Sequence, residues 1–202
     1  PAVPRRVPAH RKVPCKEVKA KILNLENNYA ELKVLERLQK KDTDLPQVNL
    51  YFSLIKQSNF ELAVEKVTEV GVISITPLIT ERTVKLGIKR ERLERIIKEA
   101  SEQSGRTNVP ILNEPIKLAE ALKEAKSLGK IIFFDPSGNN KHTENVNFQT
   151  SIFIGPEGGW SDNELKLAKE SGVQIASLGH TILRAETAAI VASYWQVNLR
   201  EL

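Results

Sequence analysis

The chain has 202 residues, of which 41% are hydrophobic and 27% are charged. This composition supports one or two folded domains, and it excludes both a disordered chain and a small domain that depends on disulfides. The single cysteine, Cys15, excludes a disulfide within the chain and indicates a reducing compartment. The sequence shows neither an apolar run long enough to cross a bilayer nor a leader peptide, so we expect a cytoplasmic protein without a membrane partner.

The formal net charge of +5 is unevenly distributed along the chain. Residues 1–21 carry seven basic side chains and one acidic side chain, so residues 22–202 are close to neutral. Clustered lysine and arginine give affinity for phosphates without regard to sequence. The distribution predicts that the basic segment contacts a polyanion, and a solvated basic tail is the alternative.

The first predicted element in chain order is a β-hairpin. Apolar and polar residues alternate over 18–22 and again over 30–35, and Asn27-Asn28 between them favours a turn. Residues 38–46, rich in Lys, Asp and Gln and ending in proline, indicate a linker. The hairpin therefore belongs to a small β domain that precedes the rest of the chain.

Strands and helices alternate after this linker. Strands are predicted at residues 48–55, 72–79, 131–134, 152–154 and 173–178, and helices at 59–70 (stopped by Gly71), 89–104, 116–128, 162–171 and 185–199. Alternation of this kind predicts an α/β fold with a mostly parallel sheet and helices on both faces. We therefore expect two domains, a small β domain at residues 1–45 and an α/β domain at residues 46–202.

Residues 152–164 combine an apolar strand, a glycine-rich turn and the start of a helix. The glycines permit close backbone approach, and Ser161 and Glu164 have the spacing of a capping box. Ligands of open α/β sheets bind beyond the carboxyl ends of the strands, where this turn falls. The pattern differs from dinucleotide-binding and ATP-binding glycine loops, since it lacks G-x-G-x-x-G and no lysine follows the glycines. It predicts a ligand loop, and a tight turn without a ligand is the alternative.

Residues 177–188 form a second loop of this kind. A strand ends near Gly179, and a helix begins close to Arg184 and Glu186. We expect the two loops to leave neighbouring parallel strands at one edge of the sheet and to form the walls of one pocket. A helix start stabilises the charge of Glu186, whereas Arg184 there requires a partner. An Arg–Glu surface pair, which contributes little to stability, is the alternative.

Five motifs in order resemble the RsmE family of ribosomal RNA uridine N3-methyltransferases, which belong to the SPOUT (trefoil-knot) class. The motifs are residues 65–72, 77–83, 99–106 with Val109-Pro110, Gly155–Trp160 and 178–188. The resemblance covers roughly residues 50–202, and five ordered motifs are far more specific than a single glycine loop. Residues 16–37 resemble the end of the PUA-like β-barrel that opens this family.

The resemblance implies a trefoil knot, a rare exception among folds, and a homodimer formed through the knotted regions. It also implies S-adenosylmethionine as cofactor, S-adenosylhomocysteine as product, and small-subunit (16S) ribosomal RNA, free or in the assembled small subunit, as substrate. The cofactor would lie between three loops. The residues that the resemblance assigns to it are Phe134, Gly155, Pro156, Glu157, Gly158, Gly159, Leu178, Gly179, Ile182 and Leu183.

Methylation of uridine N3 requires removal of the N3 proton or stabilisation of the negative charge left on O2 and O4. We assign Arg184 to charge stabilisation, because a fixed positive charge favours the developing anion. Glu186 either takes the proton or orients Arg184. A metal site is not expected, because His10, His142 and His180 lack ligand spacing.

RNA contact is predicted for basic residues of the first segment and for three residues of the family motifs. They are Arg5, Arg6, Arg11, Lys12, Arg82, Gln103 and Arg106. A structural role is the alternative for the last three. Two other functions stay open: a SPOUT methyltransferase that modifies a ribose 2′-hydroxyl or a guanine, and a non-catalytic RNA-binding protein.

Overall fold

A computed structural model of the chain describes residues 17–27, 29–38, 46–83, 87–106, 108–139 and 149–198. The chain divides into two units, residues 1–43 and 44–202. Some residues singled out from the sequence lie outside the described ranges: Arg5, Arg6, His10, Arg11, Lys12, Cys15 and His142.

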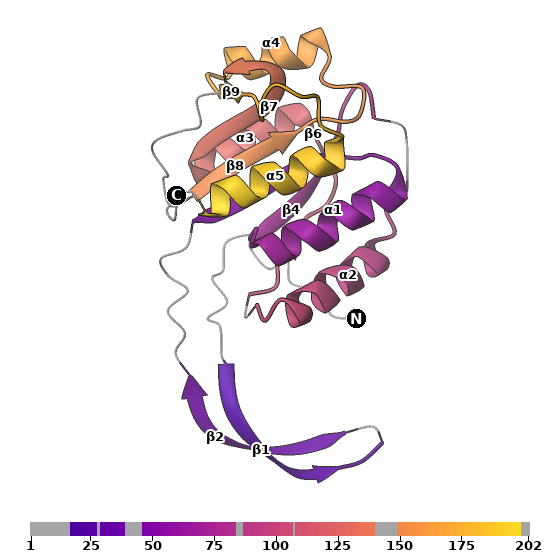
Figure 1. The fold of residues 1–202 in the computed structure, drawn as a ribbon, viewed down its shortest axis with the longest axis vertical. Helices are drawn as coiled ribbons and strands as arrows, with labels where there is room; N and C mark the ends of the chain where they lie inside the picture. The colour runs from indigo at the N-terminus through magenta and orange to yellow at the C-terminus, as the bar shows by residue number, and fades with distance from the viewer. Residues whose placement is uncertain are drawn as a thin grey trace, which may run out of the picture. The chain divides into compact units, whose positions relative to one another are not determined.

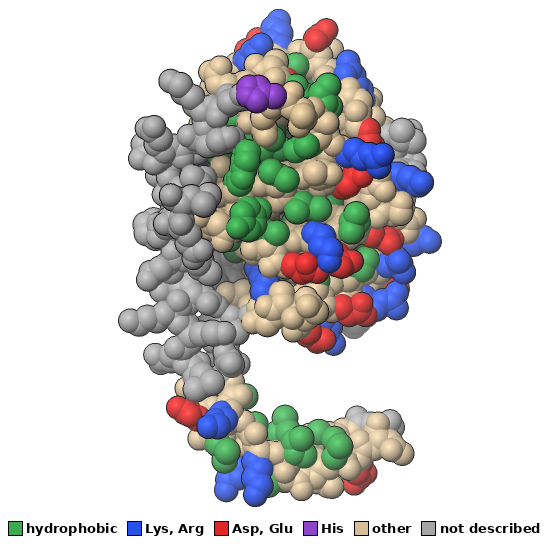
Figure 2. Space-filling view, viewed as in Figure 1, with side chains coloured by type: hydrophobic (Ala, Val, Ile, Leu, Met, Phe, Trp, Pro, Cys, Tyr) green, Lys and Arg blue, Asp and Glu red, His purple; other side chains and the backbone are tan. Residues whose placement is uncertain are grey.

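The first unit contains the predicted hairpin, in which β1 (Glu17–Leu25) pairs antiparallel with β2 (Ala30–Leu38) (Figure 1). Ile22 and Leu32 are partners across the two strands, and both are more than half exposed. Hydrophobic side chains accordingly show on the surface of the hairpin (Figure 2). A two-stranded hairpin is marginally stable on its own, so these side chains mark a face that favours a covering partner.

Seven strands of the second unit form one sheet. They are β3 (Gln47–Ser53), β4 (Ser74–Ile79), β5 (Ile111–Leu112), β6 (Ile116–Lys117), β7 (Lys130–Asn139), β8 (Gln149–Ile154) and β9 (Gln174–Ala176). The order is β5-β4-β3-β8-β7-β9, β6 also pairs with β4, and all the pairs are parallel. The predicted parallel sheet is confirmed. The sequence pattern missed β5 and β6, because two residues show no periodicity.

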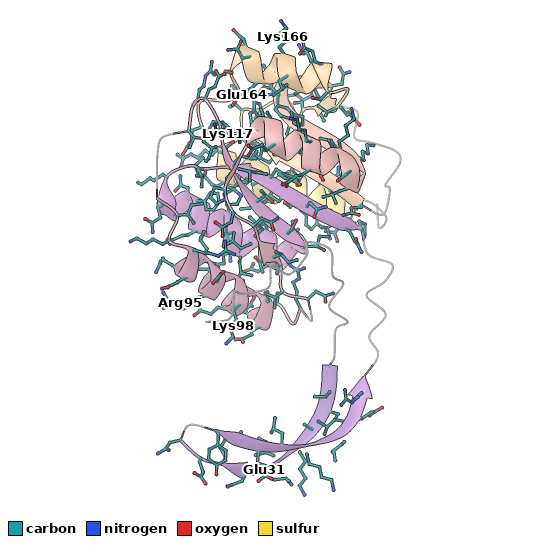
Figure 3. All side chains as sticks on the ribbon, turned by 180° about the vertical axis from the view of Figure 1, so that it is seen from behind. Glu31, Arg95, Lys98, Lys117, Glu164 and Lys166 are labelled. Carbon is teal, nitrogen blue, oxygen red and sulfur yellow. The ribbon has the colours of Figure 1, made fainter. Side chains whose placement is uncertain are left out.

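Helices cover both faces of this sheet, as predicted. In the described residues they are α1 (Gln57–Val70), α2 (Arg90–Gln103), α3 (Leu118–Leu128), α4 (Asp162–Glu170) and α5 (Ala185–Asn198). Helices α1, α2 and α5 pack with Leu50 and Phe52, while α3 and α4 pack with Tyr51 and Phe153 on the opposite face (Figures 1 and 3). Successive strand residues point to opposite faces, so a strand buried on both sides is apolar throughout.

Gly71 ends α1, as the sequence predicts. Its φ is +128°, and its N–H donates to the Val67 carbonyl at 3.1 Å. A Cβ at this position would lie 3.1 Å from Val197 Cγ1 of α5. Glycine therefore meets two needs here, a backbone conformation that other residues avoid and close packing between two helices.

Tyr51 gives the core a pH dependence. It is 3% exposed and stacks on Phe153 with ring centroids 4.5 Å apart. Burial, with a contribution from Glu124, raises the pKa of Tyr51 from 10.0 to about 12. The neutral Tyr51 side chain therefore contributes fully to the stability of the fold below pH 10, and this contribution is lost as the pH rises towards 12. We expect Tyr51→Phe to remove about 2–3 kcal/mol of alkaline destabilisation, measured by urea unfolding between pH 9 and 12. An unchanged pH dependence would contradict this.

Candidate functional site

A cavity of about 860 Å³ lies at the carboxyl edge of the sheet. Its walls come from three segments: residues 134–139 in the second half of β7, residues 154–160 from the last residue of β8 onward, and residues 177–188 between β9 and the first turn of α5. All ten residues that the resemblance assigns to a cofactor line this cavity, and Arg184 lines it too. Glu186 is not among the lining residues.

The second and third walls do not leave neighbouring strands. β7 lies between β8 and β9 and pairs with both of them. The prediction of adjacent strands was therefore wrong, because the chain order of strands does not reveal which strand lies between two others. Residues 134–139 of β7 stand in the middle and complete the cavity.

The first wall is held by its own polar side chain and by the neighbouring strand. Asp135 Oδ1 accepts the N–H of Ser137 at 2.9 Å and also its hydroxyl. A Cβ at Gly138 would lie 2.5 Å from the carbonyl carbon of Ala176, so only glycine fits against β9 here. The Ser177 N–H donates to the Asn139 carbonyl at 3.1 Å, which ties the first wall to the start of the third.

The second wall is anchored by Trp160. Its indole Nε1–H donates to the Phe134 carbonyl at 2.9 Å, and its ring centroid lies 4.2 Å from that of Phe133. A Cβ at Gly155 would lie 2.9 Å from Trp160 Cε2. The first glycine of the motif therefore makes room for the tryptophan, and the tryptophan fastens the second wall to the middle of β7.

We expect Gly155→Ala to lower the free energy of unfolding by about 1–3 kcal/mol, because the added methyl group displaces the Trp160 ring. Gly87→Ala is the matched control, since a Cβ there meets no heavy atom within 4 Å. Urea unfolding measures both variants. Equal stability of the two would show that Trp160 does not restrict position 155.

The third wall carries an exposed hydrophobic side chain and an exposed cation. The buried Ser177 hydroxyl donates to the Gly179 carbonyl at 3.0 Å and fixes the beginning of the loop. Ile182 is 87% exposed. Arg184 is exposed as well, and its guanidinium has no hydrogen-bond or ion-pair partner within the described residues. An apolar side chain and an unpaired cation thus stand open to a ligand at this wall.

Glu186 lies in the first turn of α5 and is only 7% exposed. Its Oε2 is buried and has no hydrogen-bond partner among the described residues. A buried carboxylate oxygen without a partner is costly. The surface Arg–Glu pair that the sequence left open is not formed, since Arg184 is exposed and Glu186 is buried.

The three motif residues expected to contact RNA have different surroundings. Arg82 Nη1 donates to the Gly158 carbonyl of the second wall. Arg106 donates to the carbonyls of Thr68 and Val72, where α1 passes into β4. Gln103 is the last residue of α2 and is exposed. Arg106 therefore has the contacts of a structural role. Arg82 does not line the cavity, but it contacts Gly158, which does.

Three lining residues, Pro136, Gly138 and Asn139, lie outside the segments predicted from the sequence. The others that were not assigned to the cofactor lie within those segments: Asp135, Trp160, Ser177, His180, Thr181, Ala185 and Ala188. A cluster of turn-forming residues after an apolar strand, here residues 135–139, was the available signal. His180 is exposed, and the described residues contain no group of three or more potential metal ligands. No helix in the described part of the chain is long and apolar enough to span a membrane.

Known proteins share this sequence and this fold. Residues 42–196 match the family model of an RNA methyltransferase domain. The chain is 33% identical to Ribosomal RNA small subunit methyltransferase E of Mesomycoplasma hyopneumoniae, over 84% of this chain and 77% of that protein. It is also 33% identical to the protein of that name from Rickettsia conorii, over 87% and 74% of the two chains.

A solved structure agrees with these relatives. The crystal structure of a Ribosomal RNA small subunit methyltransferase E from Neisseria gonorrhoeae bound to S-adenosyl methionine superposes with a TM-score of 0.84 and 30% identity. The match covers 92% of this chain and 80% of that one. On sequence and fold together, the chain belongs to the RNA methyltransferase family and, within it, to the ribosomal RNA small subunit methyltransferase E family.

Proposed function

We propose that this protein transfers a methyl group from S-adenosylmethionine to N3 of a uridine in small-subunit ribosomal RNA. The cavity formed by the three walls carries the proposal, because the family's cofactor positions and Arg184 all line it. The relative from Neisseria gonorrhoeae was crystallised with S-adenosyl methionine, which supports the cofactor. The choice of N3 rests on the resemblance of residues 178–188 to the uridine N3 group.

The residues of the cavity fit this cofactor. The cavity has a volume of about 860 Å³, which suits a nucleoside-sized ligand. The glycines at 155, 158, 159 and 179 line the cavity without side chains, which permits a ligand to approach the backbone closely. Phe134 and Leu178 add apolar surface for the face of a ring.

When bound, the cofactor supplies the electrophilic methyl group. We infer that Arg184 stabilises the negative charge that develops on O2 and O4 as N3 loses its proton. Its guanidinium serves this purpose without first breaking an ion pair, since it has none within the described residues. Glu186 is buried and off the cavity, so of its two candidate roles we favour orientation of the Arg184 segment over proton removal.

We infer further that two copies pair through a knotted α5 region. Hydrophobic side chains gather on the surface over α5 and α1 (Figure 2). They include Tyr194, which is 52% exposed, and Leu62, which is 44% exposed. Light scattering tests the pairing: Tyr194→Asp is expected to give a monomer if the wild-type protein is a dimer. A monomeric wild-type protein would end this inference.

We propose that residues 1–45 act as a PUA-like RNA-docking domain. Clustered basic residues in this segment supply phosphate affinity. The affinity for rRNA is therefore expected to fall steeply with salt, and neutralising Arg5, Arg6, Arg11 and Lys12 together should reduce that slope. An unchanged slope would contradict the docking role.

Transfer of a labelled methyl group tests the function as a whole. The protein is incubated with labelled S-adenosylmethionine and either free small-subunit rRNA or assembled small subunits, and the product is digested to nucleosides. Labelled N3-methyluridine supports the proposal. Label on a ribose 2′-oxygen or on guanine would assign another specificity, and RNA binding without transfer would indicate a non-catalytic protein.

A further inference from the structure

A turn after β4 is joined to the second wall of the cavity by contacts between residues far apart in sequence. The Glu81 N–H donates to Glu164 Oε1 at 2.9 Å, across 83 positions. Arg82 Nη1 donates to the Gly158 carbonyl, across 76 positions. Asn163 Nδ2 lies 3.5 Å from Glu81 Oε1 and adds a weaker contact. Adjacent residues of one turn thus hold both the glycine loop and the start of α4.

Glu164 is the centre of this junction (Figure 3). It is 5% exposed, and its Oε2 accepts the Ser161 N–H at 2.8 Å while its own N–H donates to Ser161 Oγ at 3.1 Å. The capping box predicted from the sequence is therefore complete. The other carboxylate oxygen is used on Glu81, which a helix cap does not require. Charge-assisted bonds to two backbone N–H groups at a helix N-terminus make this a strong tether.

The turn that Glu164 holds is closed by its own hydrogen bonds. Thr83 Oγ1 lies 2.7 Å from Thr80 Oγ1 and accepts the Thr80 N–H at 3.0 Å. The Thr83 N–H donates to the Thr80 carbonyl at 3.1 Å. Because the turn is closed and fastened to α4, Arg82 projects towards the glycine loop from a fixed base.

The glycine loop is the part of the cavity that most needs such support. Gly158 and Gly159 are adjacent, and glycine has more backbone freedom to lose than any other residue. The side chain of Arg82 lies along this pair: a Cβ at Gly158 would be 3.5 Å from Arg82 Cδ, and a Cβ at Gly159 would be 4.0 Å from Arg82 Nη1. A ligand that binds a loop already held in shape does not have to order it.

We propose that Arg82 and Glu164 are positioning residues that hold the second wall in its cofactor-binding conformation. This inference rests on the proposed function, because it takes S-adenosylmethionine as the ligand of the cavity. It gives Arg82 a role that differs from the RNA contact expected from the sequence. Neither residue takes part in methyl transfer, so their loss is expected to affect cofactor binding and leave the chemical step intact.

Calorimetric titration with S-adenosylmethionine, together with steady-state kinetics, tests the proposal. Arg82→Ala is expected to raise Kd and KM for the cofactor about tenfold and to change kcat at saturating cofactor less than twofold. Arg82→Lys should recover part of the loss, because an ammonium group still donates to the Gly158 carbonyl. Glu164→Gln should raise the cofactor Kd by a similar factor. The glutamine amide nitrogen cannot accept a hydrogen bond, so one of the two backbone N–H groups that the carboxylate binds loses its acceptor.

Arg90→Ala is the matched control. Arg90 also donates from its guanidinium to a backbone carbonyl, that of Leu112 at 2.7 Å, but Leu112 does not line the cavity, whereas Gly158 does. Its substitution is expected to leave Kd unchanged. Thermal unfolding of each variant with and without cofactor separates a loss of fold from a loss of binding.

The outcomes separate the two proposals. Wild-type protein that does not bind S-adenosylmethionine would refute the proposed function, and the positioning role with it. Wild-type binding with equal Kd values for Arg82→Ala and Arg90→Ala would overturn the positioning role alone. Reduced rRNA affinity of Arg82→Ala with unchanged cofactor Kd would also overturn it, and would support the RNA contact expected from the sequence.

Discussion

Arg184→Ala is expected to lower the rate constant of methyl transfer by about 100- to 1,000-fold, the usual effect of removing a charge-stabilising donor. The Kd for S-adenosylmethionine is expected to rise less than about threefold, because the other cavity walls keep their contacts. Single-turnover transfer to small-subunit rRNA measures the first quantity, and calorimetry measures the second.

Two further variants sharpen this test. Arg184→Lys keeps the positive charge but loses the planar fork of donors, so an intermediate rate is expected. Arg95→Ala is the control for loss of an exposed arginine, since Arg95 lies on α2 and has no ion-pair or hydrogen-bond partner within the described residues (Figure 3). Wild-type turnover by Arg184→Ala would remove Arg184 from the mechanism.

Trp160→Ala is expected to lower the free energy of unfolding by about 3–5 kcal/mol, as large-to-small changes of aromatic residues in a core do. Trp160 is 4% exposed, packs on Phe133 and donates to the Phe134 carbonyl. Its loss removes both the ring contact with Phe133 and the hydrogen bond to Phe134, which hold the second wall against β7, so cofactor binding should be lost as well. Urea unfolding and calorimetry measure the two effects.

Trp160→Phe separates the ring from the hydrogen bond. It keeps most of the apolar volume but leaves the Phe134 carbonyl without its donor, for an expected loss of about 1–3 kcal/mol. If the alanine and phenylalanine variants were equally stable, the hydrogen bond and not the packing would anchor the wall. Wild-type stability of the alanine variant would contradict the anchor altogether.

Much of the α/β unit was predictable because its central strands are buried on both faces. Tyr51 faces one helical layer while Leu50 and Phe52 face the other, and this produces the uninterrupted apolar run that the sequence displays. The order of the strands was not predictable in this way. Nothing in the local pattern of β7 indicates that it lies between β8 and β9, since that depends on how the crossovers pack.

The candidate site was likewise predictable where the signal is local and unpredictable where it depends on packing between distant segments. The glycines of the second wall predicted a ligand loop. The roles of individual residues came from the family resemblance, because hydrophobic periodicity does not indicate them. The contact of Arg82 with Gly158 joins residues 76 positions apart, so no local spacing reveals it. The burial of Glu186 likewise depends on the packing of α5. The RNA role of Arg5, Arg6, Arg11 and Lys12 stays a prediction, since they lie outside the described residues.

The position of β3 in the sheet has a consequence for the newly made chain. β3 pairs with β4 over residues 74–78, but its other neighbour, β8, begins at residue 149. At about 5–20 residues per second, a ribosome needs roughly 5–20 s to deliver that strand. During this interval one edge of an apolar strand has no partner, and the second and third walls of the cavity do not yet exist. A nascent chain stalled before residue 149 is therefore expected to bind chaperones strongly, and added cofactor is expected to give it no protection.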